Sequence, residues 1–333
     1  MFDPISIAII LLIILALVFD FTNGFHDCAN SIATVVATGT LTPKQAVIMA
    51  AICNFAVMFF ITFTVAATIG KGIVNPTFVD LYVIFGALSG AISWNIITWY
   101  FGLPTSSSHA LIGGLVGAVV VRSGTSPLVW EGLSKTIIFI IASPCIGFIL
   151  GAGLNTIMRN ILPNSSPRQE KFFKYAQIIS SAFYSMGHGA NDAQKTAGII
   201  WLTLIAGGVA TQASAIPIWA VFASFIAMGL GTLMGGWRIV QTLGFKLTNL
   251  EPKSGFTAEI GGGMMLFVAS SLGIPVSTTH TITGSILGVG ASQAVPKVKW
   301  KKAAEIVTAW FITIPAAASL GAAFEYLARS MIG

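Results

Sequence analysis

Two short acidic motifs interrupt otherwise apolar stretches of this sequence. Asp27 lies in the run GFHDCANS, and Asp192 lies in the run GANDAQKT. The glycine that opens each motif permits a helix to break and to free backbone carbonyls, and Asn30 and Asn191 add amide oxygens beside the carboxylates. These oxygens could hold a desolvated Na⁺, or a carboxylate could take a proton. The alternative is a buried Asp that caps a broken helix.

Two hydroxyl-rich motifs each follow a proline, Pro104 in one case and Pro275 in the other. Because proline suits the first turn of a helix, each motif is expected to open a helical segment with hydroxyls in its first turn. Free N–H groups and the positive end of the helix dipole favour an anion there. The predicted anion-binding hydroxyls are those of Thr105, Ser106, Ser107, Ser108, Ser277, Thr278 and Thr279. Ordinary N-capping is the structural alternative.

All four histidines of the chain lie in or beside these motifs. They are His26, His109, His188 and His280. Their imidazoles could orient the hydroxyls, carry protons, or hydrogen-bond a neighbouring helix. We expect these residues to support the site without binding the cargo directly.

Three more polar residues in apolar segments extend the candidate site, since ionisable groups inside a bilayer are costly and are functional hypotheses by default. Lys195 follows Asp192 by three residues and would either pair with that carboxylate or neutralise a bound anion. Gln194 is grouped with Lys195 as a ligand of the same anion. Glu259 would be either a carboxylate that binds the coupling cation or a residue at a helix end.

The hydroxyl motif occurs twice in the chain. GLPTSSSHALIGGLVG, residues 102–117, aligns without a gap with GIPVSTTHTITGSILG, residues 273–288, and six positions are identical. The acidic motifs form a second pair in the same order, which sets Asp27 against Asp192. The chain is therefore interpreted as a duplication. Its expected parts are a first repeat over 1–157, a cytoplasmic linker over 158–174 and a second repeat over 175–333.

Hydropathy defines the elements that must position these residues. Of the 333 residues, 55% are apolar and 8% are charged, against about 25% charged in a typical soluble domain. Apolar runs of about 18 residues or more are typical of transmembrane helices. The candidate passes are 5–36, 46–69, 79–101, 104–121, 136–157, 175–205, 213–235, 257–274, 277–294 and 303–330. We expect an all-α polytopic membrane protein of about ten passes, with broken helices and hydroxyl-bearing helical hairpins.

An odd number of passes in each half would place the two repeats in the membrane with opposite orientation. Inverted repeats are typical of secondary transporters that work by alternating access. If the linker is cytoplasmic, both termini lie outside, and twelve Lys and Arg residues fall inside against four outside. The positive-inside rule predicts this bias, so the net charge of +6 reflects topology and does not indicate nucleic-acid binding.

The carboxylates favour phosphate as the cargo. Monohydrogen phosphate can donate its P–OH to Asp27 or Asp192, whereas sulfate only accepts hydrogen bonds. A permease for sulfate or another tetrahedral oxyanion is an alternative, and so is a passive cation channel. A remote alternative is an intramembrane metal-dependent hydrolase, but HExxH, CxxC and GxSxG are absent from the sequence. We therefore expect a transporter and no enzymatic activity.

Four stretches of the chain resemble the inorganic phosphate transporter (PiT) family, especially its short bacterial low-affinity members. They are FDFTNGFHDCANSIATVV, ITWYFGLPTSSSHALIGG, GHGANDAQKTAGI and IPVSTTHTITGSILGVG. The resemblance covers nearly the whole chain. It implies cation-coupled phosphate uptake across a prokaryotic inner membrane through inverted repeats, often by a homodimer and without a cofactor. It also implies that the acidic residues of the family fall on Asp27 and Asp192.

The first acidic motif departs from the family pattern. Phe25 and His26 stand where the family form, GANDVANA, has Ala and Asn. This change removes one Na⁺ ligand and adds a protonatable ring. Bacterial members of this type are associated with proton symport of neutral metal phosphate, whereas other branches use Na⁺. Both H⁺ and Na⁺ are therefore open as the coupling ion, and a divalent metal is open as a co-transported partner.

Overall fold

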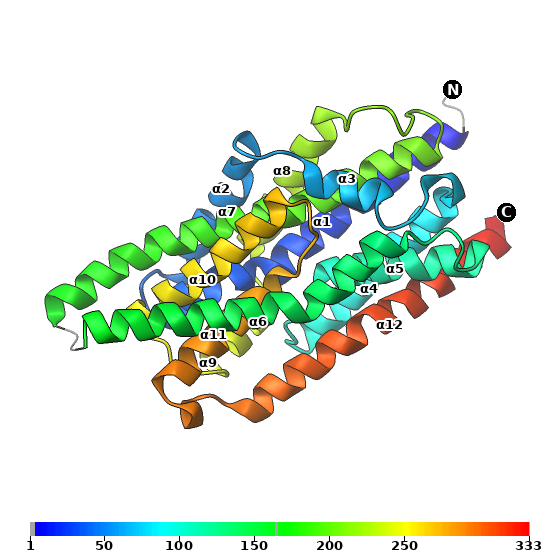
Figure 1. Cartoon of the computed structure of the whole chain (residues 1–333). Coiled ribbons are helices and arrows are strands. Elements are labelled where there is room, and N and C mark those ends of the chain that lie inside the picture. Colours follow the sequence, from blue (N-terminus) through cyan, green and yellow to red (C-terminus); the bar gives the residue numbers. More distant parts are fainter. Residues whose placement is uncertain (1–3, 164–165, 333) are drawn as a thin grey trace.

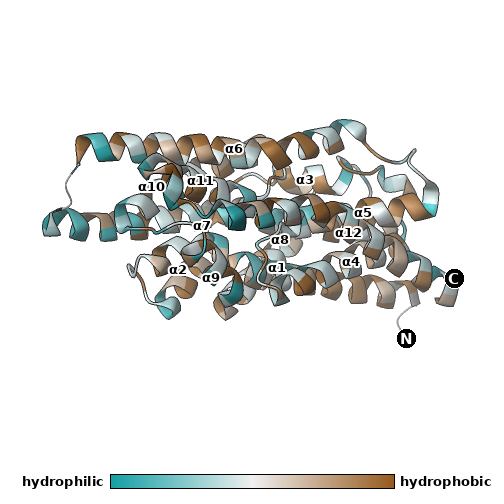
Figure 2. Cartoon of the chain, turned by 90° about the horizontal axis from the view of Figure 1, so that it is seen from below, coloured by the Kyte–Doolittle hydropathy of each residue, from teal (hydrophilic) through white to brown (hydrophobic). Residues whose placement is uncertain are grey.

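The protein is a bundle of long helices that run side by side. The computed structural model describes residues 4–163 and 166–332. Helix α1 begins, and helix α12 ends, at one end of the bundle, while α6 ends and α7 begins at the opposite end (Figure 1). Hydrophilic residues gather where α6 and α7 meet (Figure 2). Each half of the chain therefore crosses the length of the bundle an odd number of times.

The order of the helices repeats in the two halves. The first half contains α1 (Pro4–Ala37), α2 (Pro43–Ala56), α3 (Thr64–Lys71), α4 (Leu81–Tyr100), α5 (Ser107–Ser123) and α6 (Trp130–Ile161). The second contains α7 (Pro167–Ala206), α8 (Ile218–Met234), α9 (Trp237–Phe245), α10 (Pro252–Ser271), α11 (Thr278–Gln293) and α12 (Trp300–Ile332). Short 3-10 turns occur at Val57–Phe59, Pro76–Phe78 and Val295–Lys297. Each half thus has a long helix, a helix pair, a hairpin and a second long helix.

The structure has fewer helices that could span a membrane than the ten passes that hydropathy predicted. Within the part of the chain that the structure describes, four helices, α1, α4, α6 and α12, are long and apolar enough to span a bilayer. The pair formed by α2 and α3 bends by 85°, the pair formed by α8 and α9 bends by 72°, and counting each pair as one span gives up to six. The protein is therefore a helical membrane protein with broken helices, and about ten passes remains a prediction.

The acidic motifs do not break their helices, which corrects one expectation. α1 and α7 continue without interruption through Gly24 and Gly189. Both glycines instead permit a close approach of two helices. A Cβ on Gly24 would lie 2.2 Å from the Met228 carbonyl oxygen, and one on Gly189 would lie 2.5 Å from the Asn54 carbonyl oxygen. The glycines seat α1 against α8 and α7 against α2, and they free no carbonyls for a cation.

Matched glycines close the two hairpins. Gly102 follows α4 with a φ of 64°, and Gly273 follows α10 with a φ of 68°. Residues with a side chain rarely adopt this left-handed conformation, which explains a glycine at both turns. The turns return the chain toward the middle of the bundle, where α5 and α11 begin.

The linker between the halves is shorter than predicted. α6 continues to Ile161 and α7 begins at Pro167, so both helices extend into the region expected to be linker. Ser166 accepts a hydrogen bond from the backbone N–H of Gln169 and caps α7. Two residues of the expected linker, Asn164 and Ser165, lie outside the described residues.

An ion-pair cluster ties α4, α5 and α12 together at the end of the bundle where the termini lie. Asp80 Oδ2 lies 2.6 Å from Arg329 Nη2 and 3.4 Å from Arg122 Nε, while Asp80 Oδ1 accepts from the Val83 N–H and caps α4. Partial burial alone would raise the pKa of Asp80, but the hydrogen bond and charge of Arg329, with help from Arg122, bring this pKa below its usual value.

Asp80→Asn is expected to lower the free energy of unfolding by at most about 1 kcal/mol, because the pair is partly exposed and asparagine still caps the helix. A lowered folded-state pKa stabilises the protein above the unfolded pKa and loses that contribution as the pH falls through the folded pKa. Thermal unfolding in detergent at pH 7 and pH 3 measures the effect. The wild type should lose this contribution at low pH and the variant should not; equal losses in both would contradict the assignment.

Candidate functional site

The two hairpin turns meet at the centre of the molecule. The rings of His109 on α5 and His280 on α11 lie edge to face with centroids 4.8 Å apart. Trp310 of α12 touches both turns. Its ring stacks on His280 with centroids 3.9 Å apart, and its Nε1 donates to the Pro104 carbonyl at 3.0 Å. These contacts place the two hydroxyl motifs side by side, from sequence positions far apart.

Each hydroxyl motif starts its helix later than the prolines suggested. α5 begins at Ser107 and α11 at Thr278, so Pro104 and Pro275 lie in the preceding turns. Ser106 accepts a hydrogen bond from the His109 N–H at 3.2 Å, and Ser277 accepts one from the His280 N–H at 3.1 Å. Both serines are N-caps. N-capping, the alternative to anion binding, therefore accounts for the oxygen atoms of these two hydroxyls. The O–H group of each serine is still free to donate a hydrogen bond.

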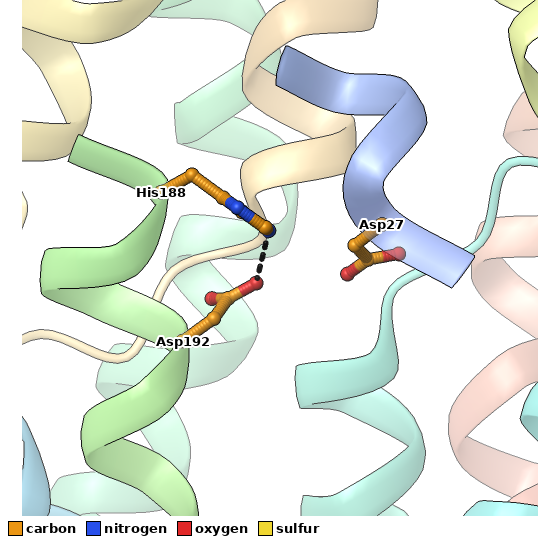
Figure 3. Close-up of side chains that lie close together, drawn as sticks. All are labelled: Asp27, His188 and Asp192. Carbon is orange, nitrogen blue, oxygen red and sulfur yellow. Dashed lines mark ion pairs between the residues drawn. The ribbon is translucent and has the colours of Figure 1, made fainter. Parts of the chain in front are cut away.

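The two acidic motifs converge beside the hairpin turns. Asp27 on α1 and His188 and Asp192 on α7 each offer a ligand atom within 4.8 Å of the others, and all three side chains are buried. His188 Nε2 lies 3.2 Å from Asp192 Oδ2, without the geometry of a hydrogen bond, and Asp27 faces this pair from α1 (Figure 3). Two carboxylates and an imidazole therefore share a small buried space.

Lys195 links this acidic cluster to both hairpin turns. Its Nζ lies 2.5 Å from Asp192 Oδ1, and it also donates to Ser108 Oγ and, at 3.0 Å, to the Val276 carbonyl. Thr278 donates to Asp192 Oδ2 at 3.1 Å. The ion pair weighed for Lys195 is thus present, and the same ammonium group lies against the hydroxyl motif.

Two asparagines predicted as cation ligands lie against the second hairpin. Asn30 donates to Thr278 Oγ1 at 3.2 Å and to Thr279 Oγ1 at 2.9 Å. Asn191 donates to Ser270 Oγ and to the Ile274 carbonyl, both at 3.1 Å. The Oδ1 atoms of both asparagines are buried and accept no hydrogen bond from the described residues. These amides position the turn and leave two acceptors available.

The histidine beside Asp27 is the feature that breaks the symmetry of the two acidic motifs. His26 Nδ1 lies 2.6 Å from Asp27 Oδ1, and its Nε2 lies 3.1 Å from Thr98 Oγ1 on α4. In the second motif the imidazole comes from His188, one turn before Asp192. Each acidic side chain thus has one imidazole within reach, supplied from a different position.

Two hydroxyls near the turns are free to meet a ligand. Thr105 Oγ1 and Ser107 Oγ are buried and have no hydrogen-bond partner among the described residues. His109 Nδ1 and His280 Nε2 are likewise buried without a partner. Buried polar groups in proteins are nearly always hydrogen-bonded, so these four atoms make the hairpin turns a candidate region for a polar ligand.

Two predicted site residues lie elsewhere. The Oε1 atom of Gln194 accepts from the N–H groups of Val65, at 3.0 Å, and Ala66, at 3.3 Å, so this amide caps the first turn of α3. The structure therefore gives no support to a phosphate contact for Gln194. This capping role could not be predicted, because hydropathy merged α2 and α3 into one pass and so hid the start of α3 that Gln194 caps.

Glu259 forms a separate buried cluster on α10. It accepts hydrogen bonds from Thr34 at 2.5 Å, from Gln177 at 3.2 Å and from Ser180. Thr34 lies seven residues after Asp27 on α1, which is about 10 Å along a helix. The donors are all neutral, and sequence reasoning had missed them. The only sequence signal was that Gln177 and Ser180 stand about three and two helical turns before His188 on α7.

Comparison with known proteins places the chain in a family. The sequence matches the Phosphate transporter family over residues 23–168 and 162–321. The chain is a member of the phosphate transporter family. It is 53% identical, over 93% of each chain, to a probable low-affinity inorganic phosphate transporter of Rhizobium meliloti (strain 1021). It is 46% identical, over 99% of each chain, to one of Bacillus subtilis (strain 168).

This family member also has a solved structural neighbour, titled the sodium-dependent phosphate transporter. The two folds agree with a TM-score of 0.86 at 25% sequence identity, over 98% of this chain and 100% of the neighbour. The resemblance seen in the four sequence stretches is therefore confirmed. These relatives are described as transporters and not as enzymes, in agreement with the expectation of a transporter.

Proposed function

We propose that the chain is a secondary active transporter that carries inorganic phosphate together with a coupling cation by alternating access. The observation that carries this proposal is the convergence of Asp27, His188 and Asp192 within 4.8 Å, beside the starts of two hydroxyl-bearing helices. One acidic motif and one hydroxyl motif from each half contribute to it. A site shared by two halves can open to either side of the membrane when the halves move relative to each other.

The topology assigned to this carrier is a pair of inverted repeats. Its support is the repeated helix order, together with the position of the chain ends and of the α6–α7 junction at opposite ends of the bundle (Figure 1). The bias of basic residues supports an orientation with the α6–α7 end in the cytoplasm and both termini outside. The bacterial relatives support the plasma membrane as the location, and a homodimer is the proposed assembly.

Phosphate is assigned to the hairpin turns. Lys195 supplies a positive charge, and Ser107, Ser108, Thr278 and Thr279 supply hydroxyls around the free N–H groups of α5 and α11. Asp192 lies beside Thr278 and Lys195, where its carboxylate would accept a hydrogen bond from the P–OH of monohydrogen phosphate. Sulfate has no such donor and could not make this contact. This arrangement favours phosphate over sulfate, and the names of the relatives agree with that choice.

Protons are the coupling ion that the geometry favours. Each carboxylate is near an imidazole, at 2.6 Å for His26 and Asp27 and at 3.2 Å for His188 and Asp192. α1 and α7 are continuous, so the free backbone carbonyls that a Na⁺ site was expected to use do not arise there. Glu259 is assigned a second protonatable position, because its partners are neutral and would hold either protonation state.

A divalent metal is the partner proposed to travel with phosphate. Na⁺ prefers oxygen ligands, whereas an imidazole nitrogen beside two carboxylates suits divalent metals such as Mn²⁺, Co²⁺ or Zn²⁺. The Nε2 atom of His188 is buried without a hydrogen bond and faces the carboxylates of Asp27 and Asp192 (Figure 3). A metal held there would neutralise much of the phosphate charge, which lowers the cost of crossing the bilayer.

Uptake of radiolabelled phosphate into proteoliposomes tests the proposal. Uptake should respond to an imposed pH gradient, should be stimulated by a divalent metal, and should be inhibited by arsenate more than by sulfate. A Na⁺ gradient alone should drive little uptake. Strong inhibition by sulfate and not by arsenate would refute phosphate as the cargo, and indifference to both ion gradients would refute symport.

A further inference from the structure

An apolar groove opens on the membrane-facing side of the molecule between α6 and α12. Its volume is about 470 Å³, its floor is Gly284 and Leu287 of α11, and its walls include Phe148 of α6 and Phe311 of α12. The lining side chains are apolar and include Trp310. The groove is therefore suited to a hydrocarbon chain.

The length of the groove matches one leaflet of a bilayer. Along α6 it runs from Ile140 to Ile149, which is about 14 Å of helix. Half of a hydrocarbon core is about 15 Å. Ile140 is level with the hairpin turns, since its carbonyl lies 3.3 Å from His280 Nδ1. A chain in the groove would thus extend from the centre of the molecule toward the end where α6 meets α7.

Basic side chains stand beyond that end of the groove, since Arg159 lies ten residues after Ile149, or about 15 Å along α6. Arg159 lies eleven residues after Phe148 on the same face of α6, and it donates to the carbonyls of Ser292 and Gln293 at the end of α11. Lys297 follows just after α11 and is exposed. Neither residue has an ion-pair partner among residues 4–163 and 166–332. Trp300, which is 45% exposed, starts α12 nearby and is typical of the membrane interface.

We propose that an anionic diacyl phospholipid binds in this groove, with one acyl chain against Trp310 and its headgroup phosphate at Arg159 and Lys297. Basic pockets between transmembrane helices are known to hold anionic headgroups. The apolar groove and Arg159 both lie where α6 packs against α11. One lipid could therefore fill the groove with an acyl chain and pair its phosphate with the basic residues. A second copy of the chain would cover the apolar part but would leave the two cations unpaired.

The bound chain bears directly on the candidate site. Trp310 lines the groove, stacks on His280 of the second hairpin and donates to the Pro104 carbonyl of the first. An acyl chain packed behind the indole would hold it against both turns. The lipid would therefore raise the phosphate uptake rate by keeping the two hydroxyl motifs together. This step rests on the proposed transport function, whereas the binding of the lipid does not.

Native mass spectrometry of the purified full chain, exchanged into phosphatidylglycerol or phosphatidylethanolamine, measures the binding. Phosphatidylglycerol should be retained preferentially. Each of Arg159→Gln and Lys297→Gln should weaken its retention by about fivefold. Cys145→Trp, which fills the groove without touching the basic end, should abolish retention. Lys171→Gln removes an exposed cation at the same end of the bundle, away from the groove, and should change nothing.

Phosphate uptake in liposomes with and without phosphatidylglycerol provides the second measurement. The anionic lipid should stimulate the wild type and the Lys171→Gln variant fully, Lys297→Gln less, and Cys145→Trp not at all. Equal retention of the two lipids, or a dimer that dissociates in Cys145→Trp while lipid retention is unchanged, would overturn the proposal. Selective retention in a protein that transports no phosphate would leave the lipid site standing and would refute the transport function instead.

Discussion

Asp27→Asn is expected to reduce phosphate uptake by about a hundredfold or more, while the protein remains folded. The substitution removes a charge that faces His188 and Asp192 in the buried cluster, and it also leaves His26 without its carboxylate. Charge-assisted hydrogen bonds in buried sites contribute about 1.5–3 kcal/mol each, which corresponds to about 10- to 100-fold per contact. Loss of a protonation site would add the loss of coupling. Initial rates of uptake under a pH gradient measure the effect.

Asp192→Asn should abolish uptake as well, but a control must separate loss of transport from loss of folding. Lys195 is buried and lies 2.5 Å from Asp192, so this variant leaves an uncompensated charge. Such a loss costs about 3–5 kcal/mol and could unfold the protein. Asp192→Asn combined with Lys195→Met removes both charges and separates the two effects.

The matched control for both acids is Asp80→Asn, because it removes a carboxylate at the end of the bundle and outside the cluster. Monodispersity and thermal unfolding in detergent should be near normal for Asp27→Asn and Asp80→Asn. Near-normal uptake by a folded Asp27→Asn variant would remove that carboxylate from the mechanism.

The second large effect is expected at the hydroxyls, and it separates binding from capping. Ser108→Ala with Thr278→Val should raise the KM for phosphate by at least about tenfold, because two hydroxyls beside Lys195 and Asp192 are lost. Ser106→Ala with Ser277→Ala should leave the KM within about threefold. It should instead lower the free energy of unfolding by about 1 kcal/mol per N-cap.

Concentration-dependent uptake and thermal unfolding, measured on both double variants, test this division. Thr279→Val offers an intermediate case, since Thr279 accepts from Asn30 and makes no contact with the acidic cluster in the described residues. A large KM effect from the two caps, with none from Ser108 and Thr278, would reverse the assignment. In that event Ser106 and Ser277 would donate to phosphate through their free O–H groups.

The candidate site was largely predictable because its residue types are rare inside a bilayer. A charged side chain is costly in that environment, so Asp27, Asp192 and Lys195 stood out from their apolar neighbours without any structure. The duplication added that the two motifs of each kind should serve one site. The contact of Lys195 with Asp192 also followed from a spacing of three residues on one helix.

The sequence could not show that α1 and α7 continue through the acidic motifs without a break. A glycine in a helix is compatible with a break, a turn or a close approach of a neighbour, and the sequence does not say which applies. At Gly24 the deciding fact is the Met228 carbonyl, which belongs to a helix more than two hundred residues later. Tertiary packing therefore decided against freed backbone carbonyls at these two positions.

The sequence by itself determined that this is a duplicated membrane protein with paired acidic and hydroxyl motifs, because hydropathy and motif identity are properties of single residues and their spacing. Only the tertiary structure decided which hydroxyls cap and which face the acids, since Ser106 and Thr278 differ by one position relative to the helix start. It also brought Trp310 against both hairpins and moved Gln194 and Glu259 out of the central cluster. Such contacts depend on how helices distant in sequence pack, which no local pattern encodes.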